Sequence, residues 1–439
     1  MSKFRQQHMP VMWHEMTQDD GDTISVDAPL SEKAGLIGRI GLMFLESGAG
    51  AYRTRAAMNK VSRALGVTCN ADIGLKSINY TCIAGKENCT NALSNRTTGV
   101  NTTKLHLLEL FSDGFADRTG KYSVDSFHTL LDKIAQTGSN YQVWQSCLAA
   151  GAACGSFAFL LGAGAIEIIC VFIAASIGFL IRKILLTHHY TLFANVGAAV
   201  LTSCFSYITL IEGVSHLFNV PADYEAGYIC SILFIVPGFP MITGGIDLAK
   251  LDLKSGIERV TYSVLVVGVA AIICAFTATT LRFNPGSFPD YTLALPIKLF
   301  LRFLASFVGV FGFSVVFNST PKMAAIAGIM GAIANFGRLL LADIGISPSF
   351  AAFAGALLVG VLASSIKRFI GFPRITITVP SIVIMVPGMF IYKGIHFLSS
   401  GDFSQGGSWL CRALVIVILL PLGLVIARIM TDRNFAKSS

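Results

Sequence analysis

Apolar positions divide the chain into a mixed first third and a strongly apolar remainder. Residues 146–430 form a series of apolar blocks, each near the length of about 20 residues that a helix needs to cross a bilayer. We predict ten spans, at 146–162, 164–181, 191–211, 226–246, 257–280, 294–317, 322–341, 347–366, 376–397 and 408–430. The pattern therefore predicts a polytopic α-helical membrane protein, preceded by a small α+β soluble domain.

The predicted domains follow from the same pattern. They are a disordered N-terminus (1–30), a cytoplasmic α+β domain (31–145), a first membrane repeat (146–280), a second membrane repeat (291–430) and a cytoplasmic tail (431–439). Within the soluble domain, we expect one amphipathic helix over 42–65, a strand near 76–83, and a helix over 124–138 capped by Ser123.

Two stretches repeat at a constant offset of 150 residues. They are SILFIVPGFPMITGGIDLAKLDLKSG at 231–256 and SIVIMVPGMFIYKGIHFLSSGDFSQG at 381–406, which are identical at nine of 26 positions. One copy lies in the fourth predicted span and the other in the ninth, so the copies must cross the membrane in opposite directions. We therefore predict two inverted-topology repeats of five spans, an arrangement typical of secondary transporters.

Each copy contains a Val-Pro-Gly sequence that should interrupt its helix. Paired half-helices can direct their N-terminal amides at an anionic substrate group, although a proline can also simply kink a packed helix. Lys298 and Arg302, one turn apart, either hold a substrate carboxylate or extend to the outer interface. The predicted substrate-binding residues are Pro237, Gly238, Gly244, Pro387, Gly388, Gly394, Lys298 and Arg302.

Four acidic residues are candidates for proton coupling. Glu167 is the first, because a carboxylate inside an apolar span is costly and usually functional. The alternatives are that it lies at the interface or pairs with a basic residue. Asp247 and Asp252 follow the first break, where they either attract an ammonium group or balance nearby lysines. Asp402 is the repeat mate of Asp252.

Charge and composition narrow the function classes. Only 13% of residues are charged, against about a quarter in a soluble protein. The net charge of +8 comes from basic residues near span ends, which predicts both termini in the cytoplasm, in the cell (plasma or inner) membrane. No nucleic-acid-binding pattern is present. We expect the lipid bilayer, a small-molecule substrate and protons as partners, and leave homo-oligomerisation open.

The sequence contains no pattern for an enzyme, a metal site or a cofactor. Glu46, Ser47 and His106 lack the spacing of a hydrolase motif, yet a soluble domain that hydrolyses the transported solute remains the alternative from another class. The ten cysteines include no CxxC pair. Cys69, Cys82 and Cys89 lie in the soluble domain, where we expect reduced thiols.

The chain resembles the threonine/serine exporters over nearly its whole length. The resemblance rests on LMFLESGAGAYRTRAAMNKVSRALGV (42–67), RTTGVNTTKLHLLELFSDG (96–114), VPGFPMITGGIDLAKLDLKSGIERV (236–260) and VPGMFIYKGIHFLSSGD (386–402). It implies a cytoplasmic N-terminal domain, ten spans, and export of threonine and serine driven by the proton motive force. Relatives with split halves are linked to dicarboxylate export, so an exporter of succinate is the alternative transport function.

Overall fold

The structure is a computed structural model that describes residues 11–17, 23–95, 98–218, 225–281, 294–399 and 401–436. The chain folds as two compact units. The sheet unit comprises the chain up to Gly138 together with Lys250–Glu258, and the helical unit comprises Ser139–Ala249 and the chain from Arg259 onwards. The predicted boundary at residue 145 lies just beyond this division.

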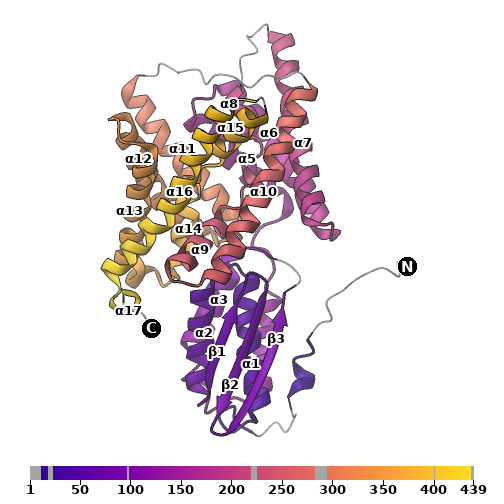
Figure 1. Cartoon of the computed structure of the whole chain (residues 1–439), viewed down its shortest axis with the longest axis vertical. Coiled ribbons are helices and arrows are strands. Elements are labelled where there is room, and N and C mark those ends of the chain that lie inside the picture. The colour runs from indigo at the N-terminus through magenta and orange to yellow at the C-terminus, as the bar shows by residue number, and fades with distance from the viewer. Residues whose placement is uncertain are drawn as a thin grey trace, which may run out of the picture. The chain divides into compact units, whose positions relative to one another are not determined.

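A three-stranded antiparallel sheet forms one layer of the sheet unit (Figure 1). Its strands are β1 (Thr68–Ile73), β2 (Ser77–Ala84) and β3 (Glu87–Ser94), in the order β1-β2-β3. Alternate residues of β2 are buried, and its Tyr80 hydroxyl donates to the Ala34 carbonyl at 2.8 Å. This period-2 burial identifies the face on which the helices pack. The strand predicted near 76–83 is confirmed.

Helices α1 (Leu30–Glu46) and α2 (Ala51–Ala64) pack on that face of the sheet. Helices α3 (Thr102–Asp113) and α4 (Val124–Ala135) pack in turn against these helices, and a 3-10 turn η1 lies at His14–Met16. The α4 prediction is confirmed, including its cap, because the Ser123 hydroxyl accepts from the Ser126 N–H at 3.2 Å. The single helix expected over 42–65 is wrong. The chain turns between α1 and α2, where Gly48 adopts a φ of +94°, a conformation that glycine adopts without strain.

The N-terminal segment contributes to the sheet unit through His14. Of the predicted disordered region 1–30, residues 1–10 and 18–22 lie outside the described residues. Within the described part, the His14 ring contacts Asp125 at 2.5 Å and Asp132 at 2.8 Å on α4. Asp132 also pairs with buried Arg39 of α1, whose guanidinium donates to His128 Nδ1 at 3.1 Å. Burial lowers the pKa of His128 to about 3, and Arg39 adds to the effect.

The linker Lys250–Glu258 also belongs to the sheet unit, although it follows the first break in the sequence. Arg55 pairs with Asp252 at 2.6 Å, and Lys254 pairs with Asp72. The Leu75 N–H donates to Glu258 at 2.5 Å. Charged side chains therefore hold this linker within the unit formed mainly by the first third of the chain.

The helical unit combines long apolar helices with several short helical segments. They are α5 (Val143–Leu160), α6 (Ala165–Thr187), α7 (Leu192–Phe218), α8 (Glu225–Cys230), η2 (Leu233–Ile235), α9 (Gly238–Ala249), α10 (Leu253–Thr280), α11 (Leu295–Val316), α12 (Pro321–Asp343), α13 (Pro348–Ile370), α14 (Arg374–Val383), α15 (Gly388–Ser399), α16 (Phe403–Thr431) and α17 (Arg433–Ala436). Within the described ranges, eight helices are long and apolar enough to span a membrane, or ten spans if each of two bent pairs counts as one.

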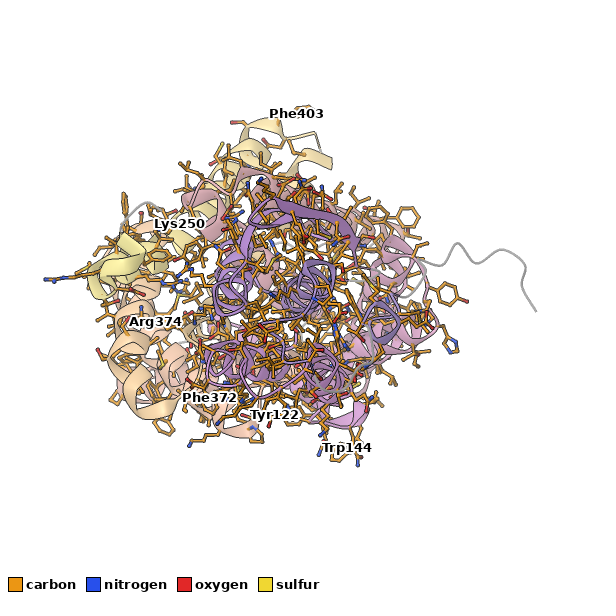
Figure 2. The ribbon with its side chains drawn as sticks, turned by 90° about the horizontal axis from the view of Figure 1, so that it is seen from below. Tyr122, Trp144, Lys250, Phe372, Arg374 and Phe403 are labelled. Carbon is orange, nitrogen blue, oxygen red and sulfur yellow. The ribbon has the colours of Figure 1, made fainter. Side chains whose placement is uncertain are left out.

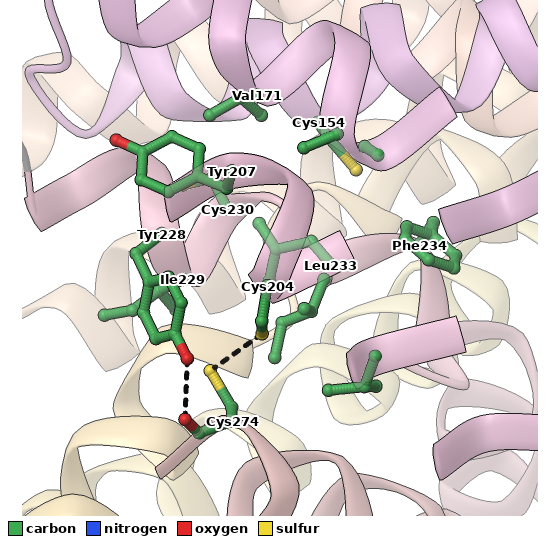
Figure 3. Packing of buried hydrophobic residues seen from close by; sticks show 14 of the residues in the cluster. Cys154, Val171, Cys204, Tyr207, Tyr228, Ile229, Cys230, Leu233, Phe234 and Cys274 are labelled. Carbon is green, nitrogen blue, oxygen red and sulfur yellow. Dashed lines mark hydrogen bonds between the residues drawn. The ribbon is translucent and has the colours of Figure 1, made fainter. Parts of the chain in front are cut away.

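Close helix contacts and outward apolar side chains fit this unit to a bilayer. A Cβ added to Gly151 of α5 would lie 2.4 Å from the Phe172 carbonyl oxygen of α6, so glycine permits close backbone approach. Inside, the Tyr228 hydroxyl donates to the Cys274 carbonyl at 2.7 Å (Figure 3). On the outside, Trp144 and Phe403 are 58% and 73% exposed (Figure 2).

We predict that His128 makes the sheet unit less stable in acid. Its folded-state pKa lies below the ordinary 6.5, so the unfolded chain binds the proton more tightly and stability falls as the pH drops below 6.5. The loss should reach about 2 kcal/mol near pH 5. Hydrogen exchange of α4 peptides at matched pH should show this acid-induced opening in the wild type.

The matched variant is His128→Asn, whose side-chain oxygen can replace Nδ1 as the acceptor for Arg39. It should lose much of the acid sensitivity. His14 acts in the opposite direction, because its hydrogen bonds to Asp132 and Asp125 raise its pKa, and the resulting stability is lost as the pH rises through that value. Equal acid sensitivity in wild type and His128→Asn would contradict the prediction.

Candidate functional site: two crossed helix breaks

Both Val-Pro-Gly sequences interrupt their helices in the same way. The segments Gly227–Ile235 and Gly238–Ala249 meet at 63°, and Arg374–Val383 and Gly388–Leu398 meet at 44°. The Gly238 N–H bonds to the Val236 carbonyl at 2.8 Å, and Gly388 does the same with Val386 at 2.9 Å. Both breaks thus follow from proline, which supplies no N–H and obstructs the preceding turn. The predicted broken helices are confirmed.

The two breaks also pack against each other reciprocally. A Cβ on Gly238 would lie 2.6 Å from Cγ2 of Val383 and 3.4 Å from Cγ2 of Val386. A Cβ on Gly388 would lie 3.0 Å from Cδ2 of Leu233, which occupies the position 150 residues before Val383. Each glycine therefore packs against the segment that precedes the other break. The contacting residues, like the two glycines, are related by the offset of 150 residues.

The broken segments run in opposite directions. Helix α8 packs beside α15, whereas α9 packs beside α14, so the first half of each segment lies against the second half of the other (Figure 1). The offset of 150 continues beyond the breaks. Leu251 and Gly401 both have left-handed φ values, of 64° and 87°, immediately before the capping positions of α10 and α16.

Polar side chains from neighbouring helices satisfy the backbone at the first break. A break in a helix frees carbonyl groups, and these are costly in an apolar environment. The Arg182 guanidinium of α6 donates to the Phe234 carbonyl at 2.7 Å, and the Ser203 hydroxyl of α7 donates to the Ser231 carbonyl at 2.8 Å. Arg182 was not among the sequence-predicted site residues, and its only sequence signal was a basic side chain near the end of an apolar block.

Glu167 is fully buried at the start of α6. Its carboxylate accepts from the Gly164 N–H at 2.7 Å and from the Gly227 N–H at 3.3 Å. Gly227 opens the first half of the broken segment. The carboxylate therefore caps its own helix and also binds the start of the segment that leads to the break.

Asp247 lies on α9, the half-helix after the first break. It is 1% exposed and pairs with Arg259 of α10, which is 3% exposed, at 3.4 Å. Arg259 also donates to the Thr243 hydroxyl at 3.5 Å. The pair joins two buried side chains and links α9 to α10.

Asp252 and Asp402 are equivalent in sequence but have different partners. Asp252 pairs with Arg55 within the sheet unit. Asp402 caps α16, because its carboxylate accepts from the Gln405 N–H and from the Gln405 side-chain amide, both at 2.9 Å. The sequence equivalence of these two carboxylates thus does not extend to their contacts.

The other predicted binding residues lie away from the breaks. Lys298 and Arg302 are on α11, and Arg302 pairs with Asp343 of α12. A Cβ added to Gly309 of α11 would contact Ile384 beside the second break. Arg302 lies about 10 Å of helix before Gly309. Gly244 is buried on α9, and Gly394 lies where α15 approaches α16, 3.0 Å from a Cβ placed on Gly406.

The remaining candidate chemistry is sparse. Among the described residues, no group of three or more His, Cys, Asp or Glu side chains could hold a metal ion. In the sheet unit, the Ser47 hydroxyl donates to the Met43 carbonyl of its own helix at 2.8 Å. That bond occupies the proton that a nucleophilic serine would pass to a base.

In the described part of the chain, eight to ten apolar helices with two crossed breaks define a multi-pass membrane protein. A family model described as "Putative threonine/serine exporter" matches residues 35–281, and a second, "Threonine/Serine exporter, ThrE", matches residues 302–430. The chain therefore belongs to the threonine/serine exporter family, as its sequence motifs indicated. This is a family of transporters rather than enzymes.

Three curated relatives show the range of the similarity. A "Probable threonine/serine exporter" of Mycobacterium tuberculosis is 20% identical over 90% of this chain and 75% of its own length. A "Probable succinate transporter subunit YjjP" of Escherichia coli is 25% identical over 50% of this chain and 83% of its own. An uncharacterised protein of Haemophilus influenzae is 30% identical over 28% of this chain, which spans 47% of that relative. No solved structure matches.

We predict that Gly238→Ala destabilises the helical unit through the crossed breaks. The new methyl would overlap Val383, and overpacking of this kind costs about 1–3 kcal/mol. The measurement is the thermal unfolding midpoint of the purified protein in detergent. Gly268→Ala in α10 is the matched control, because its Cβ would meet nothing within 4 Å.

A second substitution identifies the contact. Val383→Ala removes the methyl that Gly238→Ala would strike, so the double variant should be more stable than the sum of the single effects predicts. Strict additivity, or a Gly238→Ala midpoint equal to that of Gly268→Ala, would show that the two breaks do not touch in this way.

Proposed function

We propose that the protein is a secondary active exporter of threonine and serine, coupled to protons, with its substrate site at the crossed breaks. In this proposal each bent pair forms one span, giving ten spans in two inverted repeats. Both termini lie in the cytoplasm, and the protein resides in the cell membrane. Family membership and the name of the Mycobacterium tuberculosis relative support the substrate class.

The reciprocal packing of Gly238 and Gly388 is the observation that carries the proposal. Inverted-repeat transporters bind substrate where two broken helices meet, because irregular backbone at membrane depth survives only when protein or a wet cavity satisfies it. Helices α9 and α15 both begin at this crossing. Their first turns offer partial positive charge to a substrate carboxylate.

Glu167 is the residue that we propose to carry the proton. It is buried in a membrane span and accepts the Gly227 N–H at the start of the broken segment. Protonation would weaken both hydrogen bonds that its oxygens accept, since a neutral carboxyl is a poorer acceptor than a carboxylate. Binding a proton would thus loosen the segment that leads to the site.

We predict that Glu167→Gln uncouples transport from the proton gradient. Purified protein in liposomes should accumulate labelled threonine and serine when a pH gradient is imposed. Glu167→Gln should still exchange labelled for unlabelled substrate, but its gradient-driven accumulation should be at least tenfold lower than that of the wild type. Asp432→Asn is the matched control, because Asp432 pairs with Arg428 at the end of α16 and should leave coupling unchanged.

Two outcomes would decide against the proposal. Transport by the wild-type protein that does not depend on the pH gradient would refute proton coupling. Full accumulation by Glu167→Gln would assign the proton to another group, and Asp247→Asn would be tested next.

A second candidate is export of a dicarboxylate. The name of the Escherichia coli relative favours it, and so does the presence of Lys298 and Arg302 in α11. Labelled succinate in the same liposomes tests it, with Lys298→Gln as the variant. Succinate flux that disappears in this variant while threonine flux persists would support the dicarboxylate function. Arg302 is a poorer probe, because its variant also breaks the pair with Asp343.

A further inference from the structure

Three cysteines form a row across the sheet of the sheet unit. In the strand register, Cys69 of β1 lies opposite Cys82 of β2, and Cys82 lies opposite Cys89 of β3. All three are free thiols. The proposed exporter function involves none of these cysteines. The sheet brings them together from three different strands.

The hydrogen-bond pattern of the sheet distinguishes the two pairs. Opposed residues in antiparallel strands alternate between hydrogen-bonded pairs and closer non-hydrogen-bonded pairs. The Gly74 N–H donates to the Ser77 carbonyl, so this pair is hydrogen-bonded and, by alternation along the ladder, Cys69–Cys82 is not. Its Cα atoms are therefore about 4.5 Å apart, within the range that a disulfide requires.

The same reasoning gives the opposite result for Cys82 and Cys89. The Asn95 N–H donates to the Lys76 carbonyl at 2.7 Å, and alternation from this pair makes Cys82–Cys89 a hydrogen-bonded pair. The Cα atoms of such a pair are about 5.5 Å apart and its side chains diverge more. Cys82 therefore has one favourable partner, Cys69, and one less favourable partner, Cys89.

The surroundings of Cys69 and Cys82 give the two thiols different reactivities. Cys82 is fully buried, whereas Cys69 is half-buried and open to reagents. A hydrogen bond from the Cys82 thiol lowers the pKa of Cys69, and the Ser62 side chain of α2 lowers it further. The same interaction raises the pKa of Cys82. The thiolate is the reactive form, so Cys69 should react first.

We propose that Cys69 and Cys82 form a reversible cross-strand disulfide, which makes the sheet unit a site of thiol–disulfide exchange. The oxidant is a low-molecular-weight disulfide. The Cys69 thiolate attacks one of its sulfurs, forms a mixed disulfide and releases one thiolate. Cys82 then loses its proton and attacks the Cys69 sulfur, which releases the second thiolate. Two protein thiols become one disulfide, and one oxidant disulfide becomes two thiols that take up the two protons.

Tryptic peptides can test this pairing in the full-length protein. Cleavage after Arg63, Lys76, Lys86 and Arg96 places Cys69, Cys82 and Cys89 on three separate peptides. The protein is incubated in detergent with oxidised glutathione, blocked with an alkylating reagent, digested without reduction and analysed by mass spectrometry. We expect the peptides 64–76 and 77–86 to be joined, and dithiothreitol to separate them.

Single variants control the assignment. Cys89→Ser should keep the 64–76 to 77–86 link, because Cys89 takes no part in it. Cys82→Ser should lose the link and trap glutathione on Cys69, whereas Cys69→Ser should leave Cys82 largely unmodified. Full alkylation of both wild-type cysteines after oxidation would overturn the proposal. A dominant link between 77–86 and 87–96 would do so as well.

Discussion

The mutual contact of the two helix breaks is the constraint on which the helical unit depends. Proline removes one backbone donor at each break, and a bilayer offers no water to compensate. The backbone at each break must therefore be satisfied by neighbouring protein or by a water-filled cavity. Gly238 and Gly388 allow this because each lacks the side chain that would collide with the other segment. Arg182 and Ser203 complete the enclosure by donating to carbonyls next to the first break. A larger residue at either glycine would separate segments that must stay in contact.

The halves of the helical unit are equivalent at the breaks and differ beyond them. Helix α9 is tied to α10 by the buried pair of Asp247 and Arg259, whereas α15 packs against α16 through the close approach of Gly394 and Gly406. The linker after α9 belongs to the sheet unit through Asp252, but Asp402 only caps its own helix. The contact between the two breaks is symmetric because each glycine packs against the segment that precedes the other break. The linkers after α9 and α15 contact different parts of the chain, so the equivalent residues Asp252 and Asp402 have different roles.

The sequence was enough to predict features that depend on local chemistry or on the internal repeat. The offset of 150 residues predicted both breaks, and α9 and α15 begin and end at equivalent positions. It was insufficient where a partner comes from a distant segment. No local pattern pairs Arg182 with Phe234, or Arg302 with Asp343, because helix packing decides which side chains meet. The turn between α1 and α2 was missed for another reason. Gly48 and Gly50 interrupt the apolar spacing, but the prediction treated them as part of one continuous helix.

Among the described residues of the helical unit, the two buried carboxylates are Glu167 and Asp247, and their surroundings suit them to different tasks. Asp247 faces a guanidinium, so releasing its charge would leave Arg259 buried without its partner, which is strongly unfavourable. Glu167 is held by backbone N–H groups, whose partial charges stabilise a carboxylate more weakly than a full positive charge does. Neutralising Glu167 would weaken the hydrogen bonds that its oxygens accept, including the one from the Gly227 N–H. For these reasons we infer that Asp247 fixes α9 in place, while Glu167 transmits a change of protonation to the broken segment.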